Sequence, residues 1–180
     1  MPERMNTYIS MLRGINVSGR MVELASLYES LGLVNVRTYV QSGNVLFESP
    51  LPDSARLSRL IGDRIKKAFG FSVVVVLRIR SELQAVVKNN PFLKDHGIDP
   101  ARLYVTFLSE VPDQDALKEL QAVKDDRDDF RGTRKEVYLY CPDGYGRTKL
   151  SNNFLEKKLN VAATTRNWNT VKALLGMAGG

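Results

Sequence analysis

The chain has 180 residues and a net charge of +6, and 43% of its residues are hydrophobic and 26% charged, which is the composition of a globular protein of one or two domains. A single cysteine excludes an internal disulfide, and a single histidine leaves little material for a zinc site or a histidine-based triad. No apolar run reaches the roughly 18 residues of a membrane span, and the N-terminus lacks a secretory signal, so we expect a cytoplasmic protein with no membrane partner.

The first 80 residues predict a β-α-β-β-α-β order. Their strands are rich in β-branched and aromatic residues, and their helices carry apolar residues at i, i+3, i+4 and i+7. Gly32 is a stop signal for the first helix, and Asp53 or Ser54 can cap the second. The expected elements are a strand at 7–15, a helix at 22–32, a β-hairpin at 36–49, a helix at 53–70 and an apolar strand, expected to be central, at 72–79.

The hairpin sequence VRTYVQSGNVLFES predicts a tight turn at Ser42-Gly43. A two-residue loop pairs Tyr39 with Leu46 and Arg37 with Glu48. This register places opposite charges together and gathers apolar residues on one face of the hairpin.

The same order of elements repeats after a connection at 81–100, which contains a short helix at 81–89 and a loop at 90–100. We therefore predict an α+β protein made of two ferredoxin-like β-α-β-β-α-β halves, 1–80 and 101–180, with an extra C-terminal helix. The elements expected in the second half are a strand at 102–109, a helix at 113–123, a hairpin from 128–132 and 136–141, a helix at 149–160, a strand at 161–167 and the terminal helix at 170–178.

In each half the crossover helices make two pairs of strands parallel, so the ends of those strands meet at one edge of the sheet. In the first half this places polar donors beside Gly14 and Gly43, where backbone can approach closely. A ligand site and ordinary turn packing are both compatible with this pattern. The donors concerned are Arg13, Asn16, Gln41 and Asn44.

In the second half the same reasoning places residues 141–150 beside residues 164–170, TTRNWNT. Arg147, Lys149 and Arg166 are expected to gather near the starts of two helices, a place suited to phosphate or carboxylate. Residues 131–180 hold 9 basic and 3 acidic residues and so account for the whole net charge of the chain.

The rest of TTRNWNT admits two interpretations. Asn167 or Asn169 can cap the last helix, and Trp168 can be either a packed anchor or a flat surface for a base. Helix caps together with a core tryptophan would explain the segment without any ligand.

Motifs for familiar chemistry are missing. GYGRTK lacks the spacing of a P-loop, G-x-G-x-x-G is absent, and Ser42 lacks the frame of a hydrolase nucleophile. The polar face of the predicted hairpin offers only Tyr39 for stacking, which excludes a typical RNA-recognition module. The sequence indicates no cofactor and no metal, and it leaves open whether the protein is an enzyme.

Six segments of the chain carry a resemblance to a known family: MLRGINVSGR at 11–20, VRTYVQSGNVLFES at 36–49, NPF at 90–92, YVTFLS at 104–109, VYLYCPDGYGRTKL at 137–150 and ATTRNWNTV at 163–171. Together they resemble the bacterial family catalogued as domain of unknown function 1697. The resemblance implies two ferredoxin-like halves and no established reaction, and its shared positions include the cationic and amide residues named above. The chain departs from the family in the short link between the RGIN segment and the first helix, where relatives carry a longer and often basic loop.

Three functions remain open. The first is binding of a small anionic ligand, such as a nucleotide or a sugar phosphate, by the basic second half. The second is nucleic-acid binding by the same charges. The third is a structural or interaction role in which the shared motifs only support the fold.

Overall fold

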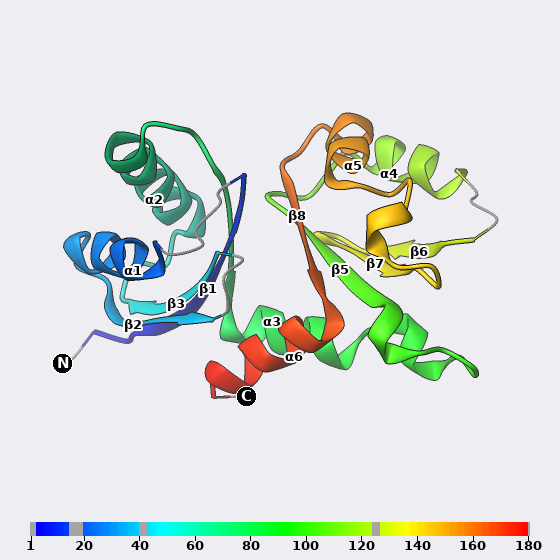
Figure 1. The fold of residues 1–180 in the computed structure, drawn as a ribbon, viewed down its shortest axis with the longest axis horizontal. Helices are drawn as coiled ribbons and strands as arrows, with labels where there is room; N and C mark the ends of the chain where they lie inside the picture. The colour runs from blue at the N-terminus through cyan, green and yellow to red at the C-terminus, as the bar shows by residue number, and fades with distance from the viewer. Residues whose placement is uncertain (1–2, 15–19, 40–42, 124–126, 180) are drawn as a thin grey trace. The chain divides into compact units, whose positions relative to one another are not determined.

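The computed structural model describes residues 3–14, 20–39, 43–123 and 127–179 (Figure 1). The chain forms two compact units, one made of Met1–Gln84 with Leu174–Gly180 and the other of Ala85–Ala173. This division differs from the sequence-based division at 1–80, 81–100 and 101–180. Most of the connection belongs to the second unit, and the last seven residues belong to the first.

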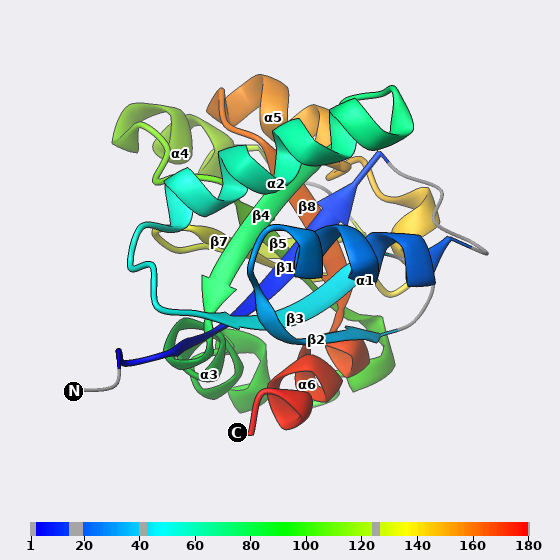
Figure 2. The same ribbon diagram turned by 90° about the vertical axis from the view of Figure 1, so that its left-hand side faces the viewer.

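The first unit contains the predicted β-α-β-β-α-β order, folded as an antiparallel sheet of order β2-β3-β1-β4. Helices α1 and α2 cover one face of this sheet (Figure 2). There Leu24 and Tyr28 of α1 and Ile61 of α2 pack on Leu12 and Phe47. The elements are β1 (Asn6–Arg13), α1 (Met21–Ser30), β2 (Val34–Tyr39), β3 (Asn44–Ser49), α2 (Ser54–Phe69) and β4 (Val74–Ile79).

Local chemistry sets the ends of α2. The side chain of Asp53 accepts a hydrogen bond from the backbone N–H of Arg56, which satisfies one of the free donors of the first turn. Gly70 ends the helix with a φ of 82°, a left-handed conformation that favours glycine.

Two details of the first unit correct the sequence analysis. The hairpin pairs Tyr39 with Asn44 and Thr38 with Val45, a shift of two residues from the predicted register, so the predicted two-residue turn is wrong. The face of each residue is preserved because an even shift does not exchange the two sides of a strand. The apolar strand β4 lies at an edge of the sheet, so the prediction that it is central is wrong. An apolar run indicates that both faces of a strand are buried, but it does not indicate how many strands pair with it.

The second unit repeats the arrangement with an antiparallel sheet of order β6-β7-β5-β8. Helices α4 and α5 cover one face of this sheet (Figure 1). There Leu120 of α4 and Leu155 of α5 pack on Leu139 and Ala163. The elements that follow β4 are α3 (Arg80–Lys88), η1 (Pro91–Lys94), η2 (Pro100–Arg102), β5 (Leu103–Leu108), α4 (Gln114–Gln121), β6 (Asp129–Gly132), β7 (Glu136–Tyr140), η3 (Tyr145–Arg147), α5 (Asn152–Leu159), β8 (Ala163–Asn167) and α6 (Trp168–Met177). None of the helices in the described part of the chain is long and apolar enough to cross a membrane.

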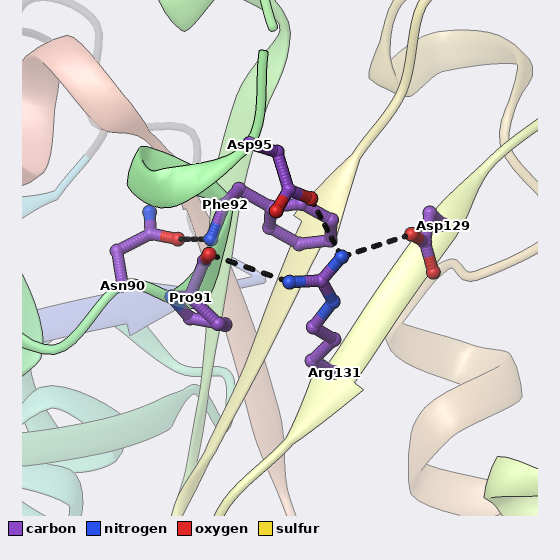
Figure 3. A network of polar contacts seen from close by, with 6 residues as sticks. All are labelled: Asn90, Pro91, Phe92, Asp95, Asp129 and Arg131. Carbon is purple, nitrogen blue, oxygen red and sulfur yellow. Dashed lines mark hydrogen bonds and ion pairs between the residues drawn. The ribbon is translucent and has the colours of Figure 1, made fainter.

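The segment NPF is fixed to the edge of the second sheet by Arg131 of β6 (Figure 3). Asn90 caps the turn η1 by accepting a hydrogen bond from the N–H of Phe92. The guanidinium of Arg131 lies 4.3 Å from the centre of the Phe92 ring and donates to Asp95 at 2.7 Å and to the carbonyl of Pro91 at 3.3 Å. A stretch expected to be a loop is therefore ordered by a cation–π contact and an ion pair.

Candidate functional site

The segment after β7 contacts the end of β8, the approach that the sequence analysis expects of residues 141–150 and 164–170. Strands β7 and β8 both pair antiparallel with β5 and so run parallel to each other. Tyr145 of η3 lies with its ring 5.3 Å from the ring of Tyr104 and donates its hydroxyl to Thr165 at 3.2 Å. The turn after β7 thus rests on the helix-covered face of the sheet.

Thr165 is the centre of a small hydroxyl network. It donates to Oδ1 of Asn152 at 2.8 Å, and its oxygen lies 2.6 Å from the hydroxyl of Thr106. Since a threonine hydroxyl has one proton, Thr106 and Tyr145 must act as donors to Thr165. The network joins η3 and the first residue of α5 to the two strands β5 and β8.

Arg166 lies on the opposite face of the sheet. Successive side chains of a strand point to opposite faces, so Arg166 lies on the other side from Thr165, and its Nη1 donates to Thr164 Oγ1 at 2.8 Å. It also donates to the carbonyl of Thr165 at 2.9 Å, and burial lowers the pKa of Arg166 to about 10. The sequence analysis expects Arg166 at the same edge of the sheet as Arg147 and Lys149, and the strand register adds that its side chain lies on the face opposite Thr165.

Three other cations flank the turn at η3, and we call them the η3 cations: Arg102, Arg147 and Lys149. Arg147 and Lys149 are exposed. Arg102 is also exposed, and its Nη1 lies beside the turn, since a Cβ built on Gly144 would lie 3.3 Å from it. Among the described residues no carboxylate lies within 4.0 Å of any of the three.

Arg102 was missed because it stands about 40 residues before the turn in the chain. The antiparallel pairing of β5 with β7 is the signal that could have identified Arg102, because β5 begins beside the end of β7. Leu103 lies opposite Tyr140, and the N–H of Cys141 donates to the carbonyl of Arg102 at 2.9 Å.

The two helix starts near this end are capped by side chains. Ser151 accepts from the N–H of Phe154 at 3.2 Å at the start of α5, and Asn167 accepts from the N–H of Thr170 at 2.8 Å at the start of α6. Asn167 is thus the cap of α6, and Asn169 is exposed on the helix.

Trp168 is 3% exposed, so its ring is packed and offers no free face for a base. Together the network, the caps and the packed tryptophan account for most of TTRNWNT as structure.

In the first unit, Arg13 and Asn44 lie on the same face of the sheet, opposite α1 and α2. Asn44 pairs with Met11, and Met11 shares its face with Arg13 two residues later. The buried Asn44 side chain donates to the carbonyl of Tyr39 at 3.2 Å, so it closes the hairpin. The predicted partners Asn16 and Gln41 lie outside the described residues.

No cluster of three or more histidine, cysteine or acidic residues in the described ranges could hold a metal ion. The polar groups that remain at the η3 end are cations, hydroxyls and amides. These groups bind anions and donate hydrogen bonds.

Comparison with known proteins identifies a similar solved structure and a matching family. A conserved bacterial protein from Streptococcus pneumoniae has a similar structure, with a TM-score of 0.74 at 22% identity, covering 97% of this chain and 99% of that one. A solved protein provisionally described as a chlorite dismutase aligns over 95% of this chain and 99% of its own length at 16% identity, but its TM-score of 0.22 bears on neither fold nor function. No curated protein matches the chain.

The family profile described as "Protein of unknown function (DUF1697)" matches residues 5–138, about three quarters of the chain. The chain therefore belongs to the DUF1697 family.

Proposed function

We propose that the protein is a cytoplasmic binding protein, built from two ferredoxin-like halves, for a small ligand that carries a phosphate or a carboxylate. The ligand binds at the η3 turn through Arg102, Arg147 and Lys149. The observation that carries the proposal is that these three exposed cations flank one turn without a carboxylate partner among the described residues. Arg166 has no part in it, because its side chain lies on the other face of the sheet.

The charges suit the chemistry of such a ligand. A guanidinium donates two parallel hydrogen bonds to a phosphate or a carboxylate, and an ammonium adds a compact point charge. Asp143, the acidic residue nearest to the turn in sequence, lies 3.7 Å from Arg127 and so has a cation of its own.

The turn itself offers an ordered and open surface. Tyr145 is held by Thr165, so the backbone that carries Arg147 is already positioned, and less ordering is required when a ligand binds. A Cβ built on Gly146 would meet no atom within 4 Å, which leaves room for a ligand to approach the turn.

The test is a thermal-shift titration with inorganic phosphate, nucleotides, sugar phosphates and dicarboxylates, followed by calorimetry on any ligand that raises the melting temperature. A ligand at 100 times its dissociation constant adds about 2.7 kcal/mol to the free energy of unfolding. The variant Arg147→Ala/Lys149→Ala is expected to weaken binding on the order of 100-fold, because charge-assisted hydrogen bonds contribute about 1.5–3 kcal/mol each.

The matched control is Arg56→Ala/Lys67→Ala, which removes the same two charges from exposed positions of α2 in the first unit. It should leave the dissociation constant nearly unchanged. Flat melting curves across the whole panel, or equal weakening by both double variants, would contradict the proposal.

Nucleic-acid binding by the same charges makes a different prediction. Its affinity would fall steeply between low and physiological salt and would depend on the length of the nucleic acid. A gel shift at low salt that the η3 double variant abolishes, together with no response to mononucleotides, would favour that alternative.

A further inference from the structure

One apolar side chain of α2 lacks the cover that its neighbours have. Leu57, Leu60, Ile61 and Ile65 follow the spacing of one helix face, and Leu57, Ile61 and Ile65 are buried at 1% exposure or less. Leu60 is 42% exposed although it stands beside them on the helix. Leu60 thus lies at the border of the buried face of α2, where part of its side chain is open to a ligand.

Leu60 lines a cavity of about 190 Å³ within the first unit. Three separate segments build its wall: the turn between α1 and β2, the end of β3 with its connection to α2, and α2 itself. Six of the lining residues are aliphatic and none is charged. The aliphatic residues are Leu31, Leu33, Leu51, Leu57, Leu60 and Ile61.

Three of the polar groups in this wall already have partners. The N–H of Leu51 donates to Ser49, the carbonyl of Leu51 accepts from Tyr8, and the N–H of Gly32 donates to the carbonyl of Glu29. A charged or strongly polar occupant would lose its hydration without gaining compensating hydrogen bonds from these groups. The chemistry of the wall therefore selects an uncharged apolar occupant.

We propose that this cavity is a binding site for a small uncharged aromatic molecule of one ring. The volume supports this class, because an apolar cavity of about 150 Å³ lined by aliphatic and aromatic side chains stays dry and takes up benzene. A cavity of about 190 Å³ therefore has room for one ring with a short substituent. The site is separate from the η3 turn and does not depend on the anionic ligand proposed there.

Toluene is the probe for this site, and benzoate is the comparison, since it has the same ring with a charged substituent. Binding is followed by the methyl resonances of leucine and isoleucine in the full-length protein. Toluene is expected to shift the resonances of Leu31, Leu51, Leu60 and Ile61 with saturation, and benzoate is expected to leave them in place.

Leu60→Lys is the diagnostic variant, because the position is partly exposed and tolerates a lysine stem while the apolar rim is lost. It should weaken toluene binding by about ten-fold, because the ring loses its apolar contact with the side chain at position 60. Leu60→Met keeps the apolar rim and should bind as the wild type does. Val22→Lys is the control, because Val22 is 81% exposed on α1 and does not line the cavity.

Several results would overturn the proposal. These are no change of the four methyl signals in toluene-saturated buffer, equal toluene affinity of wild type and Leu60→Lys, or benzoate binding as tightly as toluene. A concentration-dependent dimer that Leu60→Lys abolishes, without any toluene binding, would show that a second copy of the chain covers the cavity and would also refute the proposal.

Discussion

The substitution Thr165→Val removes the centre of the hydroxyl network while keeping the shape of the side chain. Three hydrogen bonds disappear: the donation to Asn152 at 2.8 Å, the contact with Thr106 at 2.6 Å and the donation from Tyr145 at 3.2 Å. Thr106 is fully buried, and its hydroxyl is left without that partner. Tyr145 and Asn152 are half-buried, so water can replace part of what they lose.

The expected loss follows from these three groups. A buried hydroxyl left unsatisfied costs about 1–3 kcal/mol, and each of the two half-buried bonds contributes about 0.5–1 kcal/mol net. We therefore expect the free energy of unfolding of the second unit to fall by about 2–5 kcal/mol. With a urea dependence of about 2 kcal/mol per molar, the midpoint moves down by about 1–2.5 M.

The assay is urea unfolding followed by tryptophan fluorescence. Trp168 is the only tryptophan of the chain and is buried in the second unit, so its emission reports on that unit. Thr133→Val is the control, because Thr133 makes its hydrogen bonds with Glu136 at an exposed site, and the change there should stay within about 0.5 kcal/mol. A midpoint shift of Thr165→Val no larger than that of Thr133→Val would refute the reasoning.

Two further predictions concern glycine and tyrosine positions. Gly144 has a φ of 90° and a ψ of 156°, a region open essentially to glycine alone, so Gly144→Ala should lower the free energy of unfolding by about 1–3 kcal/mol in urea. Gly146→Ala is the control, because Gly146 has a normal φ and open space around it, and it should be neutral or slightly stabilising. Equal effects of the two substitutions would contradict this reasoning. Burial raises the pKa of Tyr28 above its usual value of 10.0, although its hydrogen bond with Ser10 opposes the shift. The folded protein therefore holds the Tyr28 proton more tightly than the unfolded chain does. The contribution of Tyr28 to stability is complete below pH 10 and is lost as the pH rises further. Tyr28→Phe should reduce the slope with which the free energy of unfolding falls at alkaline pH, by up to about 1.4 kcal/mol per pH unit. The slope is measured by unfolding followed by circular dichroism from about pH 9 to about 11.5. An unchanged slope would contradict the raised pKa of Tyr28.

Much of the fold could be predicted because its helices are amphipathic and have clear stop signals. The leucines of α1 and the spacing of Leu57, Ile61 and Ile65 specify covered faces, and Gly32 and Gly70 follow the helices that they end. The register of the first hairpin could not be predicted. The predicted two-residue loop at 42–43 and the observed pairing of Tyr39 with Asn44, which leaves four residues between them, keep every side chain on the same face, so the apolar pattern does not choose between them.

The candidate site was predictable only as a region. The parallel ends of β7 and β8 bring Tyr145 to Thr165, but strand order predicts only the edge at which a residue lies and not the face that it occupies. Both faces of β8 are buried, so alternating polarity does not mark the side on which Arg166 lies. Arg102 was overlooked because its proximity depends on antiparallel pairing across β5 and β7.

The end of the chain is fastened to the first unit by two arginines. Arg37 of β2 donates to the carbonyl of Met177 at 2.5 Å, and Arg80 donates to that of Gly179 at 2.6 Å. The second unit is thus inserted, in the order of the chain, between two parts of the first. During synthesis on the ribosome, residues 85–173 emerge before the first unit receives residues 174–179, so the unit that begins first is completed last.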